Sequence, residues 1–239
     1  MFAFILRRLL QAVVVMVSVA FIAFMLFQYV GDPVVFLLGQ DATPEQIREL
    51  RADLGLDQPF IVQYWHFLVN AAQGEFGLSL RQGAKVSSLI AERFPATLEL
   101  ALVAAVLALL IGIPMGVYAA LKRGTFTSQV FMTISLLGVS LPTFLIGILL
   151  ILVFAVNLGW FPSFGRGEVT QLGWWTTGLL SAKGWHHITL PAITLAIFQL
   201  TLIMRLVRAE MLEVLRTDYI KFARARGLTN RAVHFGHAL

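Results

Sequence analysis

The residues that could do chemistry are few, and they do not form a known catalytic pattern. His186 and His187 are the only adjacent histidines. Neighbours on a helix point about 100° apart, so this pair cannot converge on one metal ion. The sequence has no Gly-x-x-x-x-Gly-Lys-Ser/Thr loop, no His-Glu-x-x-His motif, no Gly-x-Ser-x-Gly motif and no cysteine. We therefore expect no catalytic, cofactor-binding or metal-binding site in this chain, and no enzyme activity of its own.

The most informative segment is the basic ending, Asp218–Leu239, which follows a long apolar stretch. Gly227 stands where the chain can turn sharply. After it, apolar residues recur at spacings of four, three and four, which is one helical face. The sequence therefore predicts two short helices that meet at a glycine corner. The apolar positions of the second helix are Leu228, Ala232, Phe235 and Leu239.

The side chains at this corner indicate a binding surface. Ala223 and Ala225 are small enough to let another surface approach closely, and the corner is rimmed by Arg224, Arg226 and Arg231. One interpretation is an amphipathic segment that rests on anionic lipid. The other is a rigid corner that fits a groove on a partner protein. A small-residue corner is more than lipid binding requires, and it suits a protein groove better.

The elements that must position this segment are membrane-spanning helices. The chain of 239 residues is 58% hydrophobic and 13% charged, whereas soluble domains average roughly 25% charged residues. Four apolar runs are long enough to cross a hydrocarbon core of about 30 Å. We therefore expect an all-α integral membrane protein. Its spans are an N-terminal anchor within 1–30 and helices at about 97–121, 130–156 and 186–208.

The distribution of Lys and Arg predicts the orientation of these spans. Eleven of the 18 basic residues lie at the N-terminus, in the short Lys122–Arg123 loop and after the fourth span. Short basic loops stay cytoplasmic. We therefore expect a cytoplasmic N-terminus, an extracytoplasmic segment 31–96, a transmembrane core 97–208 and a cytoplasmic segment 209–239.

The extracytoplasmic segment carries helix signals. Thr43–Gln46 has the form of a capping box with proline in the first turn, and this helix should stop at Gly55. A second helix is expected from Pro59 to Gly74. Its apolar stripe comprises Ile61, Trp65, Leu68 and Ala72. Such a helix either lies at the membrane interface or packs on the tops of the spans. We expect a packed cap, with docking of a substrate-binding protein as the alternative.

Small residues and prolines mark the second and third spans. Gly112-x-x-x-Gly116, with Pro114 between them, gives the second span a face that another helix can approach closely. Gly138 and Pro142 indicate a bend in the third span, because proline removes a backbone hydrogen bond. The simpler interpretation is helix packing. The alternative is that these bends line or gate a path between subunits.

Residues Asp218–Leu228 read DYIKFARARGL, and this ending resembles the cytoplasmic coupling motif of ABC-importer permeases, Glu-Ala-Ala-x-x-x-Gly-x(9)-Ile-x-Leu-Pro. With Gly227 as its glycine, Ala223 and Leu239 match the motif, while Lys221, Phe222 and His237 depart from it. The chain resembles the dipeptide/oligopeptide permeases over essentially its whole length. The supporting motifs are Leu6–Leu9, Gly31–Pro33, Leu54–Pro59, Gly74–Ser79, Leu158–Pro162 and Leu190–Ala192.

The resemblance implies a permease subunit of type I importer fold in a bacterial or archaeal cytoplasmic (inner) membrane. Its partners would be a second homologous permease subunit, two cytoplasmic ATPase subunits, an extracytoplasmic substrate-binding protein and the lipid bilayer. Family substrates include dipeptides, oligopeptides, glutathione and nickel complexes. Members usually have six spans, so we expect this chain to be truncated within the coupling motif. The residues expected to couple to the ATPase are Asp218, Tyr219, Ala223, Arg224, Ala225, Arg226, Gly227 and Leu228.

Other function classes are less well supported. A membrane scaffold could bind a cytoplasmic partner through residues 205–239 without transporting a solute. An intramembrane enzyme would need a nucleophile–base pair or a set of metal ligands, which no span carries. The basic residues after the fourth span are partly offset by acidic ones and lie beside a membrane, so we expect no nucleic-acid partner.

Overall fold

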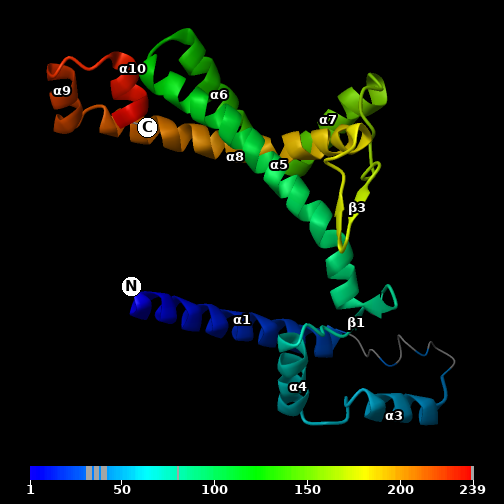
Figure 1. Cartoon of the computed structure of the whole chain (residues 1–239). Coiled ribbons are helices and arrows are strands. Elements are labelled where there is room, and N and C mark those ends of the chain that lie inside the picture. The colour runs from blue at the N-terminus through cyan, green and yellow to red at the C-terminus, as the bar shows by residue number, and fades with distance from the viewer. Residues whose placement is uncertain (31–33, 35–37, 39–41, 80, 238–239) are drawn as a thin grey trace. The chain divides into compact units, whose positions relative to one another are not determined.

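The computed structural model describes residues 1–30, 34, 38, 42–79 and 81–237. Over these residues the chain is mostly helical, with two short hairpins as its only strands (Figure 1), which confirms the all-α class. The chain divides into two compact units, residues 1–93 and 94–239. The motif Gly31–Pro33 and the last predicted motif residue, Leu239, lie outside the described residues.

The first unit begins with helix α1, Phe2–Val30, and continues with α3, Pro44–Asp53. The predicted capping box is confirmed, because Thr43 accepts a hydrogen bond from the Gln46 N–H and the Gln46 side chain accepts one from the Thr43 N–H. The predicted stop is confirmed as well. Gly55 follows the helix with a φ of 66°, a left-handed conformation that glycine adopts without strain.

Helix α4, Phe60–Ala72, occupies the range predicted between Pro59 and Gly74. It packs on α1 through Phe60, Tyr64 and Phe67. The predicted stripe of Ile61, Trp65, Leu68 and Ala72 lies on a different face. The unit ends with a hairpin that the sequence did not predict, in which β1, Leu78–Ser79, pairs antiparallel with β2, Ala84–Lys85.

Helix α5, Val86–Leu121, runs without interruption through Pro95 and Pro114, and the boundary between the two units falls inside it. The predicted span 97–121 is therefore part of a longer helix. The predicted span 186–208 likewise lies inside helix α8, Ala182–Val214. Prolines are tolerated inside such helices because neighbouring groups satisfy the freed backbone carbonyls.

The region 130–156, expected as one span with a bend, is not one continuous helix. Helices α6, Phe126–Ser140, and α7, Thr143–Leu150, are separated by a break at which the axis turns by 105°. Helix α7 then continues as a π-helical segment, Ile151–Asn157. Pro142 cannot donate a backbone hydrogen bond and stands directly before α7. The result is a full break, sharper than the expected bend.

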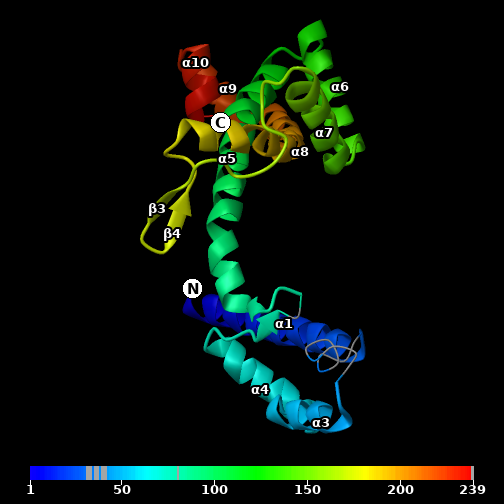
Figure 2. The ribbon, with the colours of Figure 1, turned by 90° about the vertical axis from the view of Figure 1, so that its right-hand side faces the viewer.

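The rest of the second unit is a loop with a hairpin, followed by α8 and three short helical segments. Strands β3, Thr170–Leu172, and β4, Trp175–Thr177, pair antiparallel. In the view of Figure 2 this hairpin lies on one side of α5, and α6 and α7 lie on the other. After α8 come α9, Asp218–Ala225, α10, Asn230–Ala232, and the π-helical segment η2, Val233–His237.

The core of this unit is a seam of small residues between α5 and α8. Ala104 and Ala108 of α5 and Ala196 of α8 are buried together, with Leu200 and Ile203 packed beside them. Among the described residues, α1, α5 and α8 are long and apolar enough to cross a membrane, and α6–α7 adds a fourth span if the bent pair counts as one.

Candidate functional site

The predicted two-helix corner forms at the end of α8. Helix α8 stops at Val214, and the chain turns through Leu215–Thr217 before α9 begins at Asp218. The Thr217 hydroxyl donates a hydrogen bond of 2.6 Å to the Val214 carbonyl oxygen. This bond satisfies one of the carbonyls that a helix end leaves without a partner.

Gly227 makes the corner itself. It follows α9 with a φ of 79°, its N–H donates to the Arg224 carbonyl at 2.9 Å, and the Leu228 N–H donates to the Ala223 carbonyl at 3.3 Å. These two bonds are the pattern of a Schellman motif, which needs a left-handed residue at this position. The predicted glycine corner is therefore confirmed.

A small apolar core fixes the corner to α8. Ile220, Ala223 and Val233 are buried together, and Val214 and Leu215 pack against them. Thr229 caps the next helix, because its hydroxyl accepts from the Ala232 N–H at 3.3 Å. Helix α9 and the segment Asn230–His237 therefore form one packed structure.

One expectation about this segment needs correction, and another extends beyond the described residues. Of the face predicted for the second helix, Leu228 and Phe235 are exposed and Leu239 lies outside the described residues, and the residue that packs inward is Val233. The segment Val233–His237 is π-helical. Ala223 is not open to a partner, because Val233 of the same chain covers it.

The outer face of the corner combines aromatic, aliphatic and basic side chains. Exposed large apolar residues are Tyr219, Phe222, Leu228 and Phe235. The other exposed residues of the predicted coupling set are Asp218, Arg224, Ala225, Arg226 and Gly227. The Arg226 guanidinium lies 5.7 Å from the centre of the Phe222 ring, and Asp218 pairs with Lys221 at 2.9 Å. The face is chemically suited to an acidic, partly apolar groove on a protein.

The small residues predicted for packing or gating fall into two groups. A Cβ on Gly116 would come within 2.8 Å of the Met204 carbonyl oxygen, one on Gly138 within 2.8 Å of the Thr201 hydroxyl, and one on Gly112 within 3.1 Å of Ile203. These three glycines therefore let α5 and α6 approach α8 closely. Pro114 and Pro142 are exposed.

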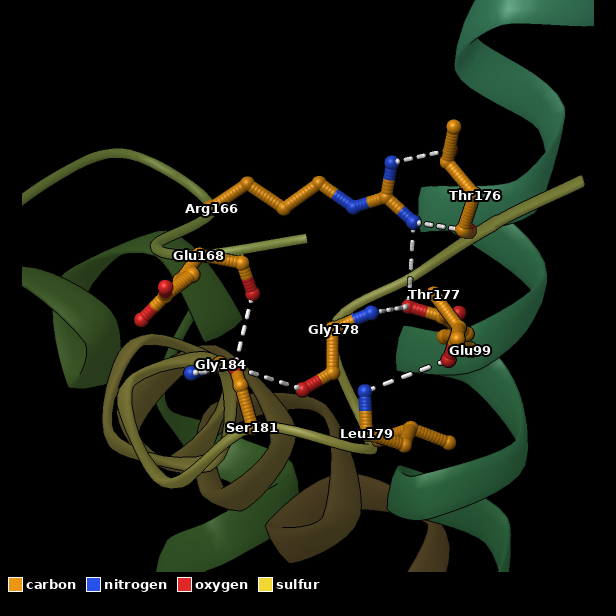
Figure 3. A network of polar contacts seen from close by, with 9 residues as sticks. All are labelled: Glu99, Arg166, Glu168, Thr176, Thr177, Gly178, Leu179, Ser181 and Gly184. Atoms are coloured by element: carbon orange, nitrogen blue, oxygen red, sulfur yellow. Dashed lines mark hydrogen bonds and ion pairs between the residues drawn. The ribbon is translucent and has the colours of Figure 1, made fainter. Parts of the chain in front are cut away.

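A buried polar network lies at the opposite end of α8 (Figure 3). Arg166, in the loop before β3, contacts the Glu99 carboxylate of α5 at 3.1 Å. Its guanidinium also donates to the Thr176 hydroxyl at 2.7 Å and to the Thr176 carbonyl at 2.6 Å. The Gly178 N–H donates to the same Glu99 oxygen at 3.3 Å. The Glu99 side chain is only 6% exposed, so it is a buried charge with a close partner.

The start of α8 belongs to this network. Ser181 caps the helix, accepting from the Gly184 N–H at 2.9 Å, and donates to the Glu168 carbonyl at 2.7 Å. A Cβ on Gly184 would overlap the Gly178 carbonyl oxygen at 1.9 Å. The loop 158–181 is therefore held to α5 by the hydrogen bonds to Glu99, and to α8 by the Ser181 cap and the close contact between Gly178 and Gly184.

Two neighbouring cavities lie under this loop. One of about 200 Å³ is lined by Glu99 and Arg166, and the other, of about 380 Å³, by Phe164 and apolar residues of α7 and α8. His187 lines both cavities and donates to the Lys183 carbonyl, whereas His186 donates to the Trp160 carbonyl. Over the described residues no three His, Asp or Glu side chains are grouped to hold a metal ion.

Sequence reasoning did not find Glu99, Arg166 or Val233. Arg166 is the only basic residue between Arg123 and Lys183. Glu168 lies two positions away and is the nearer acid, so the sequence alone did not point to Glu99 as the partner. No sequence signal marks Val233 either.

Comparisons with known proteins identify the family. Residues 112–239 match the family described as binding-protein-dependent transport system inner membrane component, and residues 1–101 match its N-terminal membrane component. The chain belongs to this family. It is a permease subunit of an ABC importer, and with its apolar helices it is a multi-pass membrane protein.

Individual relatives match this chain from end to end. A protein of Brucella suis biovar 1 (strain 1330), named for a peptide transport system permease, is 41% identical over an alignment of 240 positions that covers all of this chain and 74% of the relative. The glutathione transport system permease GsiC of Escherichia coli (strain K12) is 35% identical, covering all of this chain and 73% of the relative. The family is one of transport permeases, which work with ATPase and substrate-binding partners.

Proposed function

We propose that this permease forms part of the translocation path for peptides or a similar small solute. The names of its relatives, which refer to peptide and glutathione transport, support this substrate class. The partners proposed are a second homologous permease subunit, two cytoplasmic ATPase subunits and an extracytoplasmic substrate-binding protein. The permease itself would do no chemistry, and ATP hydrolysis would belong to the ATPase subunits.

We propose that the corner formed by α9, Gly227 and α10 docks into a groove of the ATPase. The observation that carries this proposal is that different residues of the corner are buried and exposed. Its buried residues, Ile220 and Val233, fix it to α8, while Phe222, Arg226 and Leu228 stay on the surface. Movement of the docked corner would therefore be transmitted directly into a helix of 33 residues, about 50 Å long.

The proposed topology follows from the distribution of basic residues. Residues 1–30 would cross a bacterial or archaeal inner membrane with the N-terminus in the cytoplasm, and 31–96 would be extracytoplasmic. Residues 97–208 would form the transmembrane core, and 209–239 would lie in the cytoplasm. In this arrangement the Glu99–Arg166 network lies at the extracytoplasmic end of the core. Gly112, Gly116 and Gly138 would act by close helix packing.

Substitutions at Gly227 test the docking role. Gly227→Ala adds only the strain of a left-handed alanine, since no atom lies within 4 Å of the added Cβ. Gly227→Trp adds the same strain together with bulk at the corner. We expect Gly227→Trp to abolish substrate-stimulated ATP hydrolysis and uptake in reconstituted vesicles, and Gly227→Ala to keep most of both. Normal stimulation in Gly227→Trp, with normal membrane insertion, would contradict docking at this corner.

A further inference from the structure

Helix α4 has three chemically different faces and no charged residue. The first face packs on α1 through Phe60, Tyr64 and Phe67. The second is apolar and exposed, with Ile61 76%, Trp65 64% and Val69 38% accessible. The third carries the polar residues Gln63, His66 and Asn70. At about 100° per residue these sets occupy three separate sectors of the helix.

The contact between α4 and α1 lies along the side of α1. The rings of Phe60 and Tyr64 meet Phe21 edge to face, with centroids 5.6 and 5.2 Å apart. Phe24 contacts the rings of Phe60, Tyr64 and Phe67. The Tyr64 hydroxyl donates a hydrogen bond of 2.6 Å to the Val17 carbonyl oxygen.

These contact positions lie within the membrane-crossing part of α1. Over its described side chains the apolar span of α1 reaches Leu26, and Phe24 and Phe21 precede that residue by two and five positions, or about 3 and 8 Å along the helix axis. The hydrocarbon core is about 30 Å thick in total. The ring contacts of α4 therefore fall near one end of this span, at the depth of about 5–10 Å at which an interfacial helix lies, and only the Tyr64 hydroxyl reaches Val17.

The polar groups of α4 fit this depth. A tyrosine hydroxyl in hydrocarbon needs a hydrogen-bond acceptor, and Tyr64 finds one in the Val17 carbonyl. The Gln63 amide donates to the carbonyls of Leu56 and Gln58 at 3.2 and 2.7 Å. His66 and Asn70 lie together on an exposed edge of the helix, where headgroups or water can solvate them.

We propose that α4 is an interfacial membrane helix that lies against α1 and binds lipid. Ile61, Trp65 and Val69 would face the acyl chains, and His66 and Asn70 the headgroups. Within the unit of residues 1–93, these three residues are exposed and α4 lies directly against the apolar helix α1. A helix with one apolar and one uncharged polar side is the form that lies in the plane of an interface. The choice of the outer leaflet rests on the proposed topology, whereas the contact of α4 with the apolar helix α1 does not.

Single-cysteine labelling can test this directly, because the chain has no cysteine. Spin labels would be placed at Ile61→Cys, Trp65→Cys and Val69→Cys, with His66→Cys and Asn70→Cys as matched controls on the same helix. The assembled importer would be reconstituted in phosphatidylcholine vesicles. Collision with oxygen, which partitions into acyl chains, would be compared with collision with a water-soluble nickel chelate.

The inference predicts that oxygen exceeds the nickel chelate at positions 61, 65 and 69, and that this ratio reverses at 66 and 70. Equal access of the nickel chelate to both faces would overturn it in favour of a water-exposed cap. Low access of both reagents at 61, 65 and 69 would overturn it in favour of a protein partner, such as the second permease subunit.

Two further readouts separate this inference from the proposed function. Stimulated ATP hydrolysis would be measured on the same labelled samples. An active importer whose α4 faces water refutes only the lipid-bound helix, whereas a lipid-bound α4 in a correctly assembled but inactive importer refutes only the proposed function. A membrane-impermeant maleimide added outside the vesicles would assign the leaflet through His66→Cys in molecules of known orientation. Protection of that cysteine from the extracytoplasmic side would overturn the outer-leaflet assignment.

Discussion

The two ends of helix α8 are fixed by different physical means. At its start, the Glu99–Arg166 ion pair and the Ser181 cap tie a loop to two helices through charge and hydrogen bonds. At its far end, Ile220 and Val233 hold α9 and η2 by apolar packing. The first end therefore buries charge, whereas the second buries apolar side chains and leaves its arginines outside.

This difference indicates what each end is suited to do. A buried ion pair favours one arrangement of the loop, because any other would leave a desolvated charge without its partner. An apolar core is less directional, and it leaves Arg226 and Phe222 free to contact another protein. The start of α8 is thus built as a fixed anchor, and its far end as a fixed platform that carries the face proposed to dock on the ATPase.

The largest effect is expected from breaking the anchor. Arg166→Ala would leave the Glu99 carboxylate buried without its cation and should lower the free energy of unfolding by about 3 kcal/mol. The matched control is Lys183→Ala, whose pair with Glu168 is exposed at 3.5 Å and should contribute about 0–1 kcal/mol. Thermal unfolding in detergent would compare the two. If both variants lost the same small amount of unfolding free energy, the Glu99–Arg166 network would not be an anchor.

Close packing at the same end gives the next largest effect. Gly184→Ala places a Cβ on the Gly178 carbonyl oxygen, so the backbone must move, at a cost of about 1–3 kcal/mol. Gly236→Ala, at the far end, meets nothing within 4 Å and should leave the melting temperature unchanged. A melting temperature equal to the wild type for Gly184→Ala would show that the loop yields easily.

The platform should separate folding from docking. Val233→Ala removes core volume at a cost of about 1–2 kcal/mol, and it should speed hydrogen exchange in α9 and η2 without lowering the global melting temperature. Phe235→Ala, at an exposed position, should leave exchange unchanged and weaken only the stimulation of the ATPase. If both variants changed exchange alike, Phe235 would be part of the core.

The smallest effect is expected at Arg226. Its guanidinium stacks on an exposed Phe222 ring at 5.7 Å, an interaction of about 0.5–1 kcal/mol at such sites. Arg226→Ala should therefore reduce coupling by less than tenfold, and Arg226→Lys by less still. The concentration of ATPase that half-saturates stimulated hydrolysis would show this. A complete loss of coupling in Arg226→Ala would mean that this arginine pairs with a buried acid on the partner.

Sequence reasoning succeeded where local signals decide the structure. The Thr43 capping box, the stop at Gly55 and the corner at Gly227 each depend on residues within a few positions of one another. Composition alone predicted the all-α membrane fold, because an apolar run long enough to cross a membrane indicates a transmembrane helix.

It failed where distant or irregular geometry decides. The pair of Glu99 and Arg166 joins residues 67 positions apart, and no periodicity connects them. The π-helical segment Val233–His237 and the burial of Val233 were not predicted. Pro142 was identified as a bend, but the angle of 105° depends on how α6 and α7 both pack on α8.

The most direct test of the central claim compares the two ends of α8 by crosslinking. A single cysteine at Ala225, on the exposed face of the corner, would be crosslinked in the assembled importer, with a single cysteine at Leu172, on the exposed β3–β4 hairpin, as the control. If the corner couples the permease to its ATPase, position 225 should crosslink to the ATPase subunit and position 172 should not. An importer that hydrolyses ATP in response to substrate while position 225 gives no such crosslink would contradict the claim.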